Sequence, residues 1–432
     1  MYTLIRENLP FSRPQAGLGR KPRIQPVSST VVLLGLTSLI TDISSEMVNT
    51  ILPLYFIYFI SLTPLHFGII DGLYQGFAAP LRLLGALIAD RTRRYKEIAT
   101  FGYAISAVCK LGFLLVGSVW LMFTAVLLID RSGKGLRTSP RDAMISFNSP
   151  RKSLGTAFGV HRAMDTLGAL LGPLIAFFIL QMTPGAFKSI FFISFCVALI
   201  GVSVIALFVE NRPTESNVTP APEPEPAPKL QLRETLGLLA RPQILKLVVI
   251  AGLLALFTIS DAFLYLVLQR QFDLEFGFFP LLYVGTACVY FVLAIPIGWL
   301  SDRIGRGKVL TGGYVLLLLV YTALLRTPGG TAEVGIYLVL FGAYYAATDG
   351  VLMAIASTHL AEATRASGMA LLTTVTSLAR FFGSVMFGAL WTWKGADTAT
   401  ATLLAGLLVA TIAAAVFLTR EEKEANVSAS AA

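Results

Sequence analysis

Long apolar runs separated by short charged segments dominate the pattern of this chain. Roughly 20 consecutive apolar residues are needed to cross the hydrocarbon core of a bilayer. Runs of that length fall at 30–57, 67–89, 98–117, 119–146, 154–180, 188–208, 244–268, 276–300, 309–325, 334–357, 368–390 and 398–419. The pattern predicts an all-α integral membrane protein with about twelve transmembrane helices, of which the fourth carries the most charge.

One charged phrase occurs twice, about half the chain apart. Segment 85–96 reads GALIADRTRRYK and segment 298–308 reads GWLSDRIGRGK. Each copy follows the second long apolar run of its half. The duplication predicts two similar six-helix bundles, which is the layout of a secondary transporter that rocks around a central site.

Composition agrees with a membrane protein, because 55% of the residues are hydrophobic, only 14% are charged and the mean hydropathy is +0.72. The net charge of +9 does not indicate nucleic-acid binding, since the basic residues lie in short segments between apolar runs. Cys109, Cys196 and Cys288 are far apart in sequence, without metal-ligand spacing. We therefore expect no cofactor and no disulfide framework.

The distribution of basic residues predicts the topology. Lys and Arg gather in alternate connections, at positions 6–23, 91–96, 151–152 and 303–308, whereas the other connections carry few. The positive-inside rule then places both termini on the cytoplasmic side of the membrane. The apolar run that follows the polar N-terminal tail is too long for a cleavable signal, so we expect the tail to be retained.

Five regions follow from these patterns. We expect a cytoplasmic tail at 1–26, an N-terminal six-helix bundle at 27–210, a linker at 211–241, a C-terminal bundle at 242–419 and a second tail at 420–432. The linker contains APEPEPAP, which favours an extended polyproline conformation. Its predicted role is a cytoplasmic spacer, with partner binding as the less favoured alternative.

The span from about 30 to 419 resembles the major facilitator superfamily. The repeated phrase is similar to that family's motif between its second and third helices, which latches the halves on the cytoplasmic side. The second copy matches well, whereas the first has Ala86 and Arg93 where the motif has glycines. By resemblance, the predicted cytoplasmic gate comprises Asp90, Arg91, Arg94, Asp302, Arg303 and Arg306.

Other phrases narrow the resemblance. A bacterial subgroup with largely unassigned substrates has phrases similar to TDISSEM at 41–47, GKGLRTSPRD at 133–142 and AFGVHRAMDTLG at 157–168. It includes magnetosome-associated permeases for which iron transport is proposed. This resemblance implies a location in a bacterial inner membrane or a membrane derived from it. Gly168 and Gly172, followed by Pro173, are similar to the start of an antiporter motif in the fifth helix. The same spacing also serves close helix packing in any membrane protein, and we favour that interpretation.

Charged residues inside the apolar runs are the candidate site, because a charge in the bilayer needs a partner, water or a function. In the family, helices one, four, seven and ten line a central cavity, so Asp42, Glu46, Asp261 and Asp349 would face one another there. His161, Arg162, Asp165 and Arg380 complete the predicted cavity set. Asp42, Glu46 and Asp261 would be the ligands if a metal cation is carried; proton binding is the alternative use of these carboxylates.

Structural roles compete with these assignments. Asp165 and Arg162 are spaced to form an intrahelical ion pair, and a helical histidine such as His161 is more often hydrogen-bonded and inert. Asp71 would gate the outer side or lie at the interface. Four charged residues lie near the cytoplasmic end of helix four: Lys134, Arg137, Arg141 and Asp142. We expect them to form salt bridges between the bundles and to contact lipid head groups, with binding of an anionic substrate as the less favoured alternative.

The predicted function is secondary active transport of a small solute, slightly favoured to be a cation such as iron, by alternating access with proton coupling. One alternative is proton-driven efflux of small organic compounds; another is a non-transporting sensor or assembly factor on the same fold. No enzyme motif is present. The predicted partners are the lipid bilayer and a small-molecule or ion substrate, with no nucleic acid, and the predicted state is a monomer.

Overall fold

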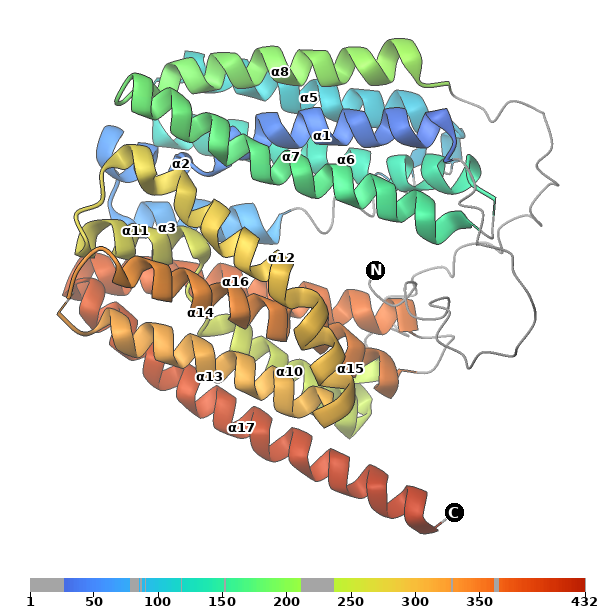
Figure 1. The fold of residues 1–432 in the computed structure, drawn as a ribbon, viewed down its shortest axis with the longest axis vertical. Coiled ribbons are helices and arrows are strands. Elements are labelled where there is room, and N and C mark those ends of the chain that lie inside the picture. Colours follow the sequence, from blue (N-terminus) through green and yellow to red (C-terminus); the bar gives the residue numbers. More distant parts are fainter. Residues whose placement is uncertain are drawn as a thin grey trace, which may run out of the picture.

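The structure is a computed structural model. It describes residues 27–77, 85, 88–89, 91–117, 119–150, 153–210, 237–327, 329–360 and 365–431, and the side chains within these ranges except those of 359, 365–367 and 419–431. Helices make up the architecture of these residues, and they run roughly parallel or antiparallel in two bundles, one above the other in Figure 1.

The elements of the first bundle are α1 (Ser29–Asn49), α2 (Leu52–Leu54), the π-helix η2 (Tyr55–Phe59), α3 (Pro64–Gly76), α5 (Tyr95–Leu115), α6 (Trp120–Phe147), α7 (Leu154–Met182) and α8 (Phe187–Phe208). The elements of the second are η4 (Leu238–Ala240), α10 (Pro242–Leu256), α11 (Asp261–Gln271), η5 (Phe276–Phe278), α12 (Phe279–Ile304), α13 (Arg306–Leu324), α14 (Glu333–Thr348), α15 (Val351–His359), α16 (Arg365–Lys394) and α17 (Ala396–Ala431).

Ten helical segments in the described ranges are long and apolar enough to cross a membrane, and each coincides with a predicted run. The predicted run at 67–89 is only partly described, as α3. The run at 119–146 is continuous helix in α6, but it carries six charged residues: Asp130, Arg131, Lys134, Arg137, Arg141 and Asp142. The fold of two helical bundles is therefore confirmed. Helix α17 continues to Ala431, through the region expected to be a C-terminal tail.

Three of the predicted spans are not continuous α-helices. The first is interrupted at Thr50 and Ile51 and continues into the π-helix η2. The seventh breaks between α10 and α11, and Ser260 caps α11 by accepting a hydrogen bond from the Phe263 amide at 3.5 Å. The tenth breaks at Gly350, whose φ of 80° lies in the left-handed region that glycine tolerates. Discontinuous helices commonly mark binding sites in transporters.

Glycines set the close packing inside the first bundle. Helix α7 lies along α1, and a Cβ added at Gly172 would approach the Ile43 carbonyl oxygen to 2.7 Å and the Glu46 Cβ to 2.9 Å. Gly168 meets the Leu39 carbonyl in the same way. These contacts confirm the packing interpretation of the two glycines. They also fix the position of Glu46 relative to α7.

The halves meet along two helix pairs, α3 with α16 and α7 with α12. The α3–α16 contact is backbone against backbone, because a Cβ on Gly68 would lie 2.5 Å from the Ser384 carbonyl oxygen and 3.3 Å from the Gly388 Cα. Gly72, one turn further along α3, lies similarly close to Phe381. Side chains larger than hydrogen at these positions would force the helices apart.

One end of this interface is tightly closed. Tyr58 donates a hydrogen bond to Gln269 Oε1 at 2.6 Å, the Leu65 amide donates to Thr392 Oγ1 at 2.9 Å, and Phe67 packs against Phe263 with 4.9 Å between ring centroids. Each contact joins the first half to the second. We call this end, opposite to the start of α1, the closed end.

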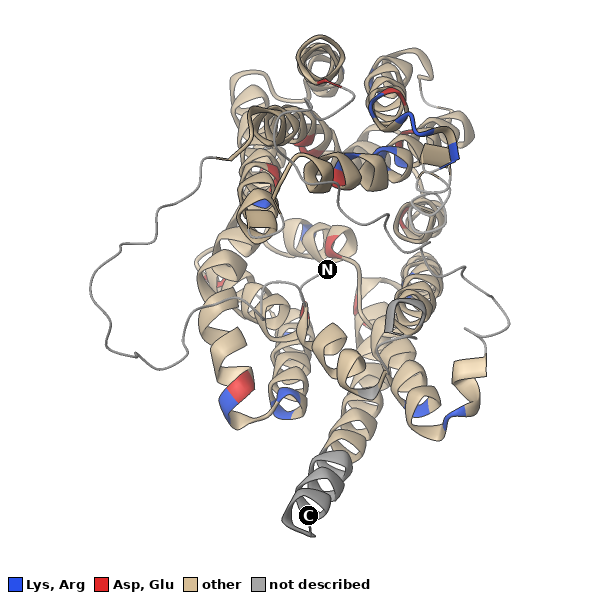
Figure 2. Cartoon of the chain, turned by 90° about the vertical axis from the view of Figure 1, so that its right-hand side faces the viewer, with Lys and Arg blue, Asp and Glu red and all other residues tan. Residues whose placement is uncertain are grey.

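Toward the other end, called the linker end, α1 and α10 begin and α8 finishes. Phe177 of α7 packs against Phe278 of η5, just before α12 begins, and α7 and α12 diverge toward this end (Figure 1). A Cβ added at Gly159 on α7 or at Gly298 on α12 would meet nothing within 4 Å. Figure 2, drawn along the helices from this end, shows Lys and Arg at several of the near helix ends. The structure is thus closed at one end and spread at the other.

We predict that Gly68→Val separates α3 from α16 and loosens the closed end. With Cys109, Cys196 and Cys288 replaced by alanine and Thr392 by cysteine, a membrane-impermeant thiol reagent should then label that cysteine faster. Gly76→Val is the matched control on the same helix, because its Cβ would first meet Phe381 at 3.9 Å. Equal labelling rates in the two variants would contradict this role of α3–α16.

Candidate functional site

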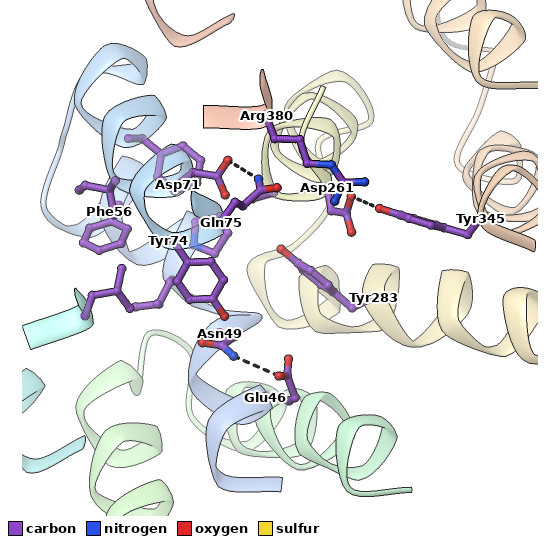
Figure 3. A pocket seen from close by; sticks show the side chains of 16 residues that line it. Glu46, Asn49, Phe56, Asp71, Tyr74, Gln75, Asp261, Tyr283, Tyr345 and Arg380 are labelled. Carbon is purple, nitrogen blue, oxygen red and sulfur yellow. Dashed lines mark hydrogen bonds between the residues drawn. The ribbon is translucent and has the colours of Figure 1, made fainter. Parts of the chain in front are cut away.

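A cavity of about 280 Å³ lies between the two halves. It is lined from the first half by α1, the α1–η2 segment, α3 and α6, and from the second half by α11, α12, α14 and α16. The polar lining residues are Glu46, Asn49, Asp71, Tyr74, Gln75, Asp261, Tyr283, Tyr345 and Arg380 (Figure 3). Glu46, Asp261 and Arg380 were predicted for this cavity, and the structure brings all three to its wall.

Glu46 is held by neutral and cationic neighbours of its own half. Asn49 Nδ2 donates to Glu46 Oε1 at 3.1 Å, and Arg131 Nη2 in turn donates to Asn49 Oδ1 at 3.2 Å. The Arg131 guanidinium stacks 3.5 Å from the ring centroid of Tyr74 and donates to its hydroxyl oxygen. The carboxylate of Glu46 therefore faces the cavity on a rigid support.

Asp261 and Arg380 lie on the wall of the second half. The Tyr345 hydroxyl donates a hydrogen bond to Asp261 Oδ1. Arg380 is solvent-exposed and lines the cavity. Among the described residues, no carboxylate lies within 4.0 Å of its guanidinium. Figure 3 shows Tyr283 between this group and Glu46 on the facing wall.

A second chamber of about 270 Å³ continues the first and shares with it Glu46, Asp261, Tyr283 and Tyr345. Asp349, also predicted for the site, lines this chamber and accepts a hydrogen bond from the Tyr290 hydroxyl at 3.2 Å. The break before α15 allows this placement, since Asp349 follows the last residue of α14. The two chambers form one site that carboxylates and phenols dominate.

Asp71 joins the cavity to the closed end. Its Oδ2 accepts hydrogen bonds from Ser384 Oγ at 2.6 Å and from Gln75 Nε2 at 3.0 Å, and Ser260 also bonds to its carboxylate. Two of these donors belong to the second half. From the sequence, Asp71 was predicted to gate the outer side or to lie at the interface. In the structure it also lines the cavity. Its position near the end of a predicted run did not indicate this.

Asp42 does not line either chamber, in contrast to the prediction. It is buried and turned toward α6 and α7, where Arg137 Nη2 lies 3.8 Å from its carboxylate. The reason is the position along α1: Asp42 lies one helical turn nearer the linker end than Glu46, and the two chambers reach α1 only from Glu46 onward. His161, Arg162 and Asp165 lie on α7 in the same separate cluster.

That cluster is a network around α6. Arg141 lies 2.9 Å from Asp142 and 3.8 Å from Asp165, and it donates to Ser38 Oγ at 3.1 Å. Ser38 Oγ is also 3.0 Å from His161 Nε2, so this histidine is hydrogen-bonded within the bundle. The predicted metal ligands are therefore divided between two places, and no group of three potential ligands is placed for a metal ion in the described part of the chain.

The predicted gate residues are charged groups at the linker end. Asp302 lies 3.9 Å from Arg306, which also donates to the Ala354 carbonyl at 3.3 Å, and Arg303 stacks on Trp299. These contacts stay within the second half, as expected where the halves are spread. Asp90 lies outside the described residues, while Arg91 and Arg94 are exposed.

Both loop copies have a residue with a positive φ at the same position. Gly305 has a φ of 103°, and Arg93, at the equivalent position of the first copy, has a φ of 56°. The first copy therefore adopts a positive φ although it lacks the motif glycine. Because a residue with a side chain is strained at such a φ, this costs the first copy about 1 kcal/mol.

A buried ion pair anchors α5 to α6 away from the cavity. Lys110 Nζ lies 2.7 Å from Asp130 Oδ1, and both side chains are at most 5% exposed. Breaking such a pair leaves a buried charge without its partner, which costs about 3–5 kcal/mol, whereas replacing both members is much less damaging. This pair is part of the structure of the first bundle.

We predict that Lys110→Met lowers the free energy of unfolding in detergent by about 3–5 kcal/mol, and that adding Asp130→Leu restores most of the loss. Thermal unfolding followed by tryptophan fluorescence measures both. A double variant as unstable as the single one would show that the ion pair is itself required for the α5–α6 contact.

Comparison with known proteins assigns the family. The family model described as Major Facilitator Superfamily matches residues 34–384 and 258–432. The chain belongs to this superfamily. An uncharacterised transporter of the same type from Methanocaldococcus jannaschii is 33% identical over 84% of this chain and 89% of its own length. The protein is thus a multi-pass membrane transporter.

The chain is also similar to two transporters whose names state a substrate class. The human lysosomal dipeptide transporter MFSD1 is 29% identical over 34% of this chain and 31% of its own length. A variant of the nucleoside transporter NupG superposes with a TM-score of 0.76 at 14% identity, covering 90% of this chain and all of that one, and this similarity concerns the fold.

Proposed function

We propose that this superfamily member carries a small zwitterionic organic solute, such as an amino acid or a short peptide, by alternating access. The observation that carries the proposal is the placement of Glu46 and Arg380 on facing walls of one cavity, with tyrosines between them (Figure 3). Glu46 would pair with the solute's ammonium group and Arg380 with its carboxylate. Tyr283 and its neighbours favour an organic cation through their ring faces.

The chemistry of the lining supports an organic solute over a metal ion. Metal sites in proteins converge several hard or soft ligands on one point. Here Glu46 and Asp261 lie on opposite walls and accept hydrogen bonds from Asn49 and Tyr345 respectively. A bidentate guanidinium such as that of Arg380 suits a carboxylate and would repel a metal cation. The partial relative with a dipeptide substrate agrees with this choice.

The basic residues at the linker end support an orientation of the chain in the membrane. We propose that the linker end faces the cytoplasm of a bacterial cell, as the basic residues at positions 303–308 indicate, and that the chain is therefore inward-facing here. Closing it would bring the loop residues Asp302 and Arg306 toward the first half. Rocking between two such states requires only a few kcal/mol of differential binding. We propose coupling to the proton gradient as the driving force.

We predict that Glu46→Gln and Arg380→Gln each weaken binding of a zwitterionic dipeptide by about ten- to hundredfold, because each removes one charge-assisted contact. Arg380→Lys should retain part of the affinity, since it keeps the charge but loses the bidentate geometry. Binding of labelled dipeptide to purified protein measures these effects.

Asp397→Asn is the matched control, because Asp397 is exposed at the start of α17, outside the cavity. The comparison should be repeated in proteoliposomes with a dipeptide, with ferrous iron and with a cationic dye as alternative solutes. Saturable iron uptake that depends on Glu46 but is indifferent to Arg380 would refute the zwitterion assignment and favour a cation carrier.

A further inference from the structure

The cluster around Asp42 is not used by the solute site, yet it contains an unusual contact. The carboxyl groups of Asp42 on α1 and Asp165 on α7 are within hydrogen-bond reach of each other. An ionised carboxylate can only accept hydrogen bonds, so two carboxyl groups in this contact need one proton between them. From this geometry we propose that Asp42 and Asp165 form a proton-binding pair and carry the coupling proton.

Two arginines flank the pair, but at a longer distance than a hydrogen bond. Arg137 Nη2 lies 3.8 Å from Asp42, and Arg141 Nη1 lies 3.8 Å from Asp165. Both arginines come from α6 and are four residues apart, so they project from the same face of that helix. Because neither arginine donates a hydrogen bond at this distance, the contact between the two carboxyl groups is not replaced by a hydrogen-bonded ion pair.

Other titratable groups face the pair from each neighbouring helix. Lys134 of α6 interacts with Asp42, whereas Asp142 of the same helix is engaged by Arg141. From α7, Arg162 lies 4.0 Å from Asp165, and His161 is bonded to Ser38. From α5, Tyr103 packs its ring 4.4 Å from the Arg137 guanidinium. His161 is already engaged within the bundle, which leaves the two carboxyl groups as the exchangeable proton site.

The pair has a route for the proton. The Asp165 side chain is 22% exposed, compared with 11% for Asp42, and the adjacent Arg162 is 55% exposed. Asp165 also lies in the half of α7 nearer the linker end, about 16 Å from the start of the helix at a rise of about 1.5 Å per residue. A proton would enter from the linker end through Asp165 and be shared with the more deeply buried Asp42.

The position of Asp42 links this proton to the solute. Asp42 and Glu46 lie one helical turn apart on α1, at a separation of about 5–6 Å between Cβ atoms. Protonation of the pair removes negative charge next to Glu46, which weakens the attraction of Glu46 for a solute ammonium group. Solute binding would correspondingly favour release of the proton, because linkage between two sites is reciprocal. This step rests on the proposed solute function; the proton pair itself does not.

Infrared spectroscopy tests the pair independently of any solute. The wild-type protein should show a protonated-carboxyl C=O band that disappears on titration to high pH. Asp42→Asn and Asp165→Asn should each remove the whole band, since one proton is shared by the two groups, and Asp397→Asn should leave it intact. Two separate bands, of which each variant removes one, would overturn the pair, as would a band unchanged in both.

Transport assays then test its role in coupling. Both asparagine variants should lose accumulation driven by a pH gradient while keeping solute exchange at equal pH, and Asp42→Glu should recover part of the accumulation. Dipeptide affinity should fall as the pH is lowered in the wild type and become independent of pH in the variants. Full pH-driven accumulation in Asp42→Asn would overturn the coupling role. If the wild type binds no dipeptide while the shared band is present, the solute assignment fails and the proton pair stands.

Discussion

The constraint on which this structure depends is the cost of placing charge in hydrocarbon. An unpaired charge at the centre of a bilayer costs about 2.5–3.5 kcal/mol on insertion scales, so each one must find a partner or water. The chain divides its charges accordingly. Lys110 and Asp130 neutralise each other between α5 and α6, whereas Glu46 and Arg380 remain hydrated because a cavity reaches them.

The two halves contribute differently to that cavity. The second half supplies its carboxylates at helix breaks: Asp261 begins α11 after the Ser260 cap, and Asp349 follows the end of α14. An acidic group at a helix N-terminus is stabilised by the partial positive charge of that end, which helps to hold Asp261 in the membrane. The first half instead presents Glu46 from a continuous α1, supported by Asn49 and Arg131. The first-half carboxylate thus projects from within a helix, whereas the second-half carboxylates lie at helix breaks.

The sequence predicted the fold because hydropathy over a whole span is a strong signal, and the repeated loop phrase located the boundary between halves. It predicted Glu46, Asp261, Asp349 and Arg380 for the cavity because an intramembrane charge is rarely without function. It placed Asp42 there as well, whereas the structure places Asp42 beside Arg137 and outside both chambers. Four-residue spacing shows that Asp42 and Glu46 share a face of α1, but it does not show how far along α1 the cavity extends.

Other features could not be predicted from the sequence. The break between α10 and Ser260 consists of Phe257, Thr258 and Ile259, and none of these residues is a glycine or proline that would predict it. The tyrosines of the second half read as ordinary apolar residues within long runs, although Tyr345 and Tyr290 bond to cavity carboxylates. Asp71 binds Ser384, 313 residues away in sequence, across the closed end. Such long-range partners follow from the packing of α3 on α16.

The central claim is that one solute is held at both ends, by Glu46 and by Arg380. Calorimetric titration of the purified protein with three forms of one dipeptide tests it most directly: the free zwitterion, its N-acetyl derivative without the ammonium group, and its methyl ester without the carboxylate. Binding of the zwitterion, with both derivatives weakened by about tenfold or more, is the predicted result. Equal binding of the zwitterion and the methyl ester would contradict the claim, because Arg380 would then have no anionic group to recognise.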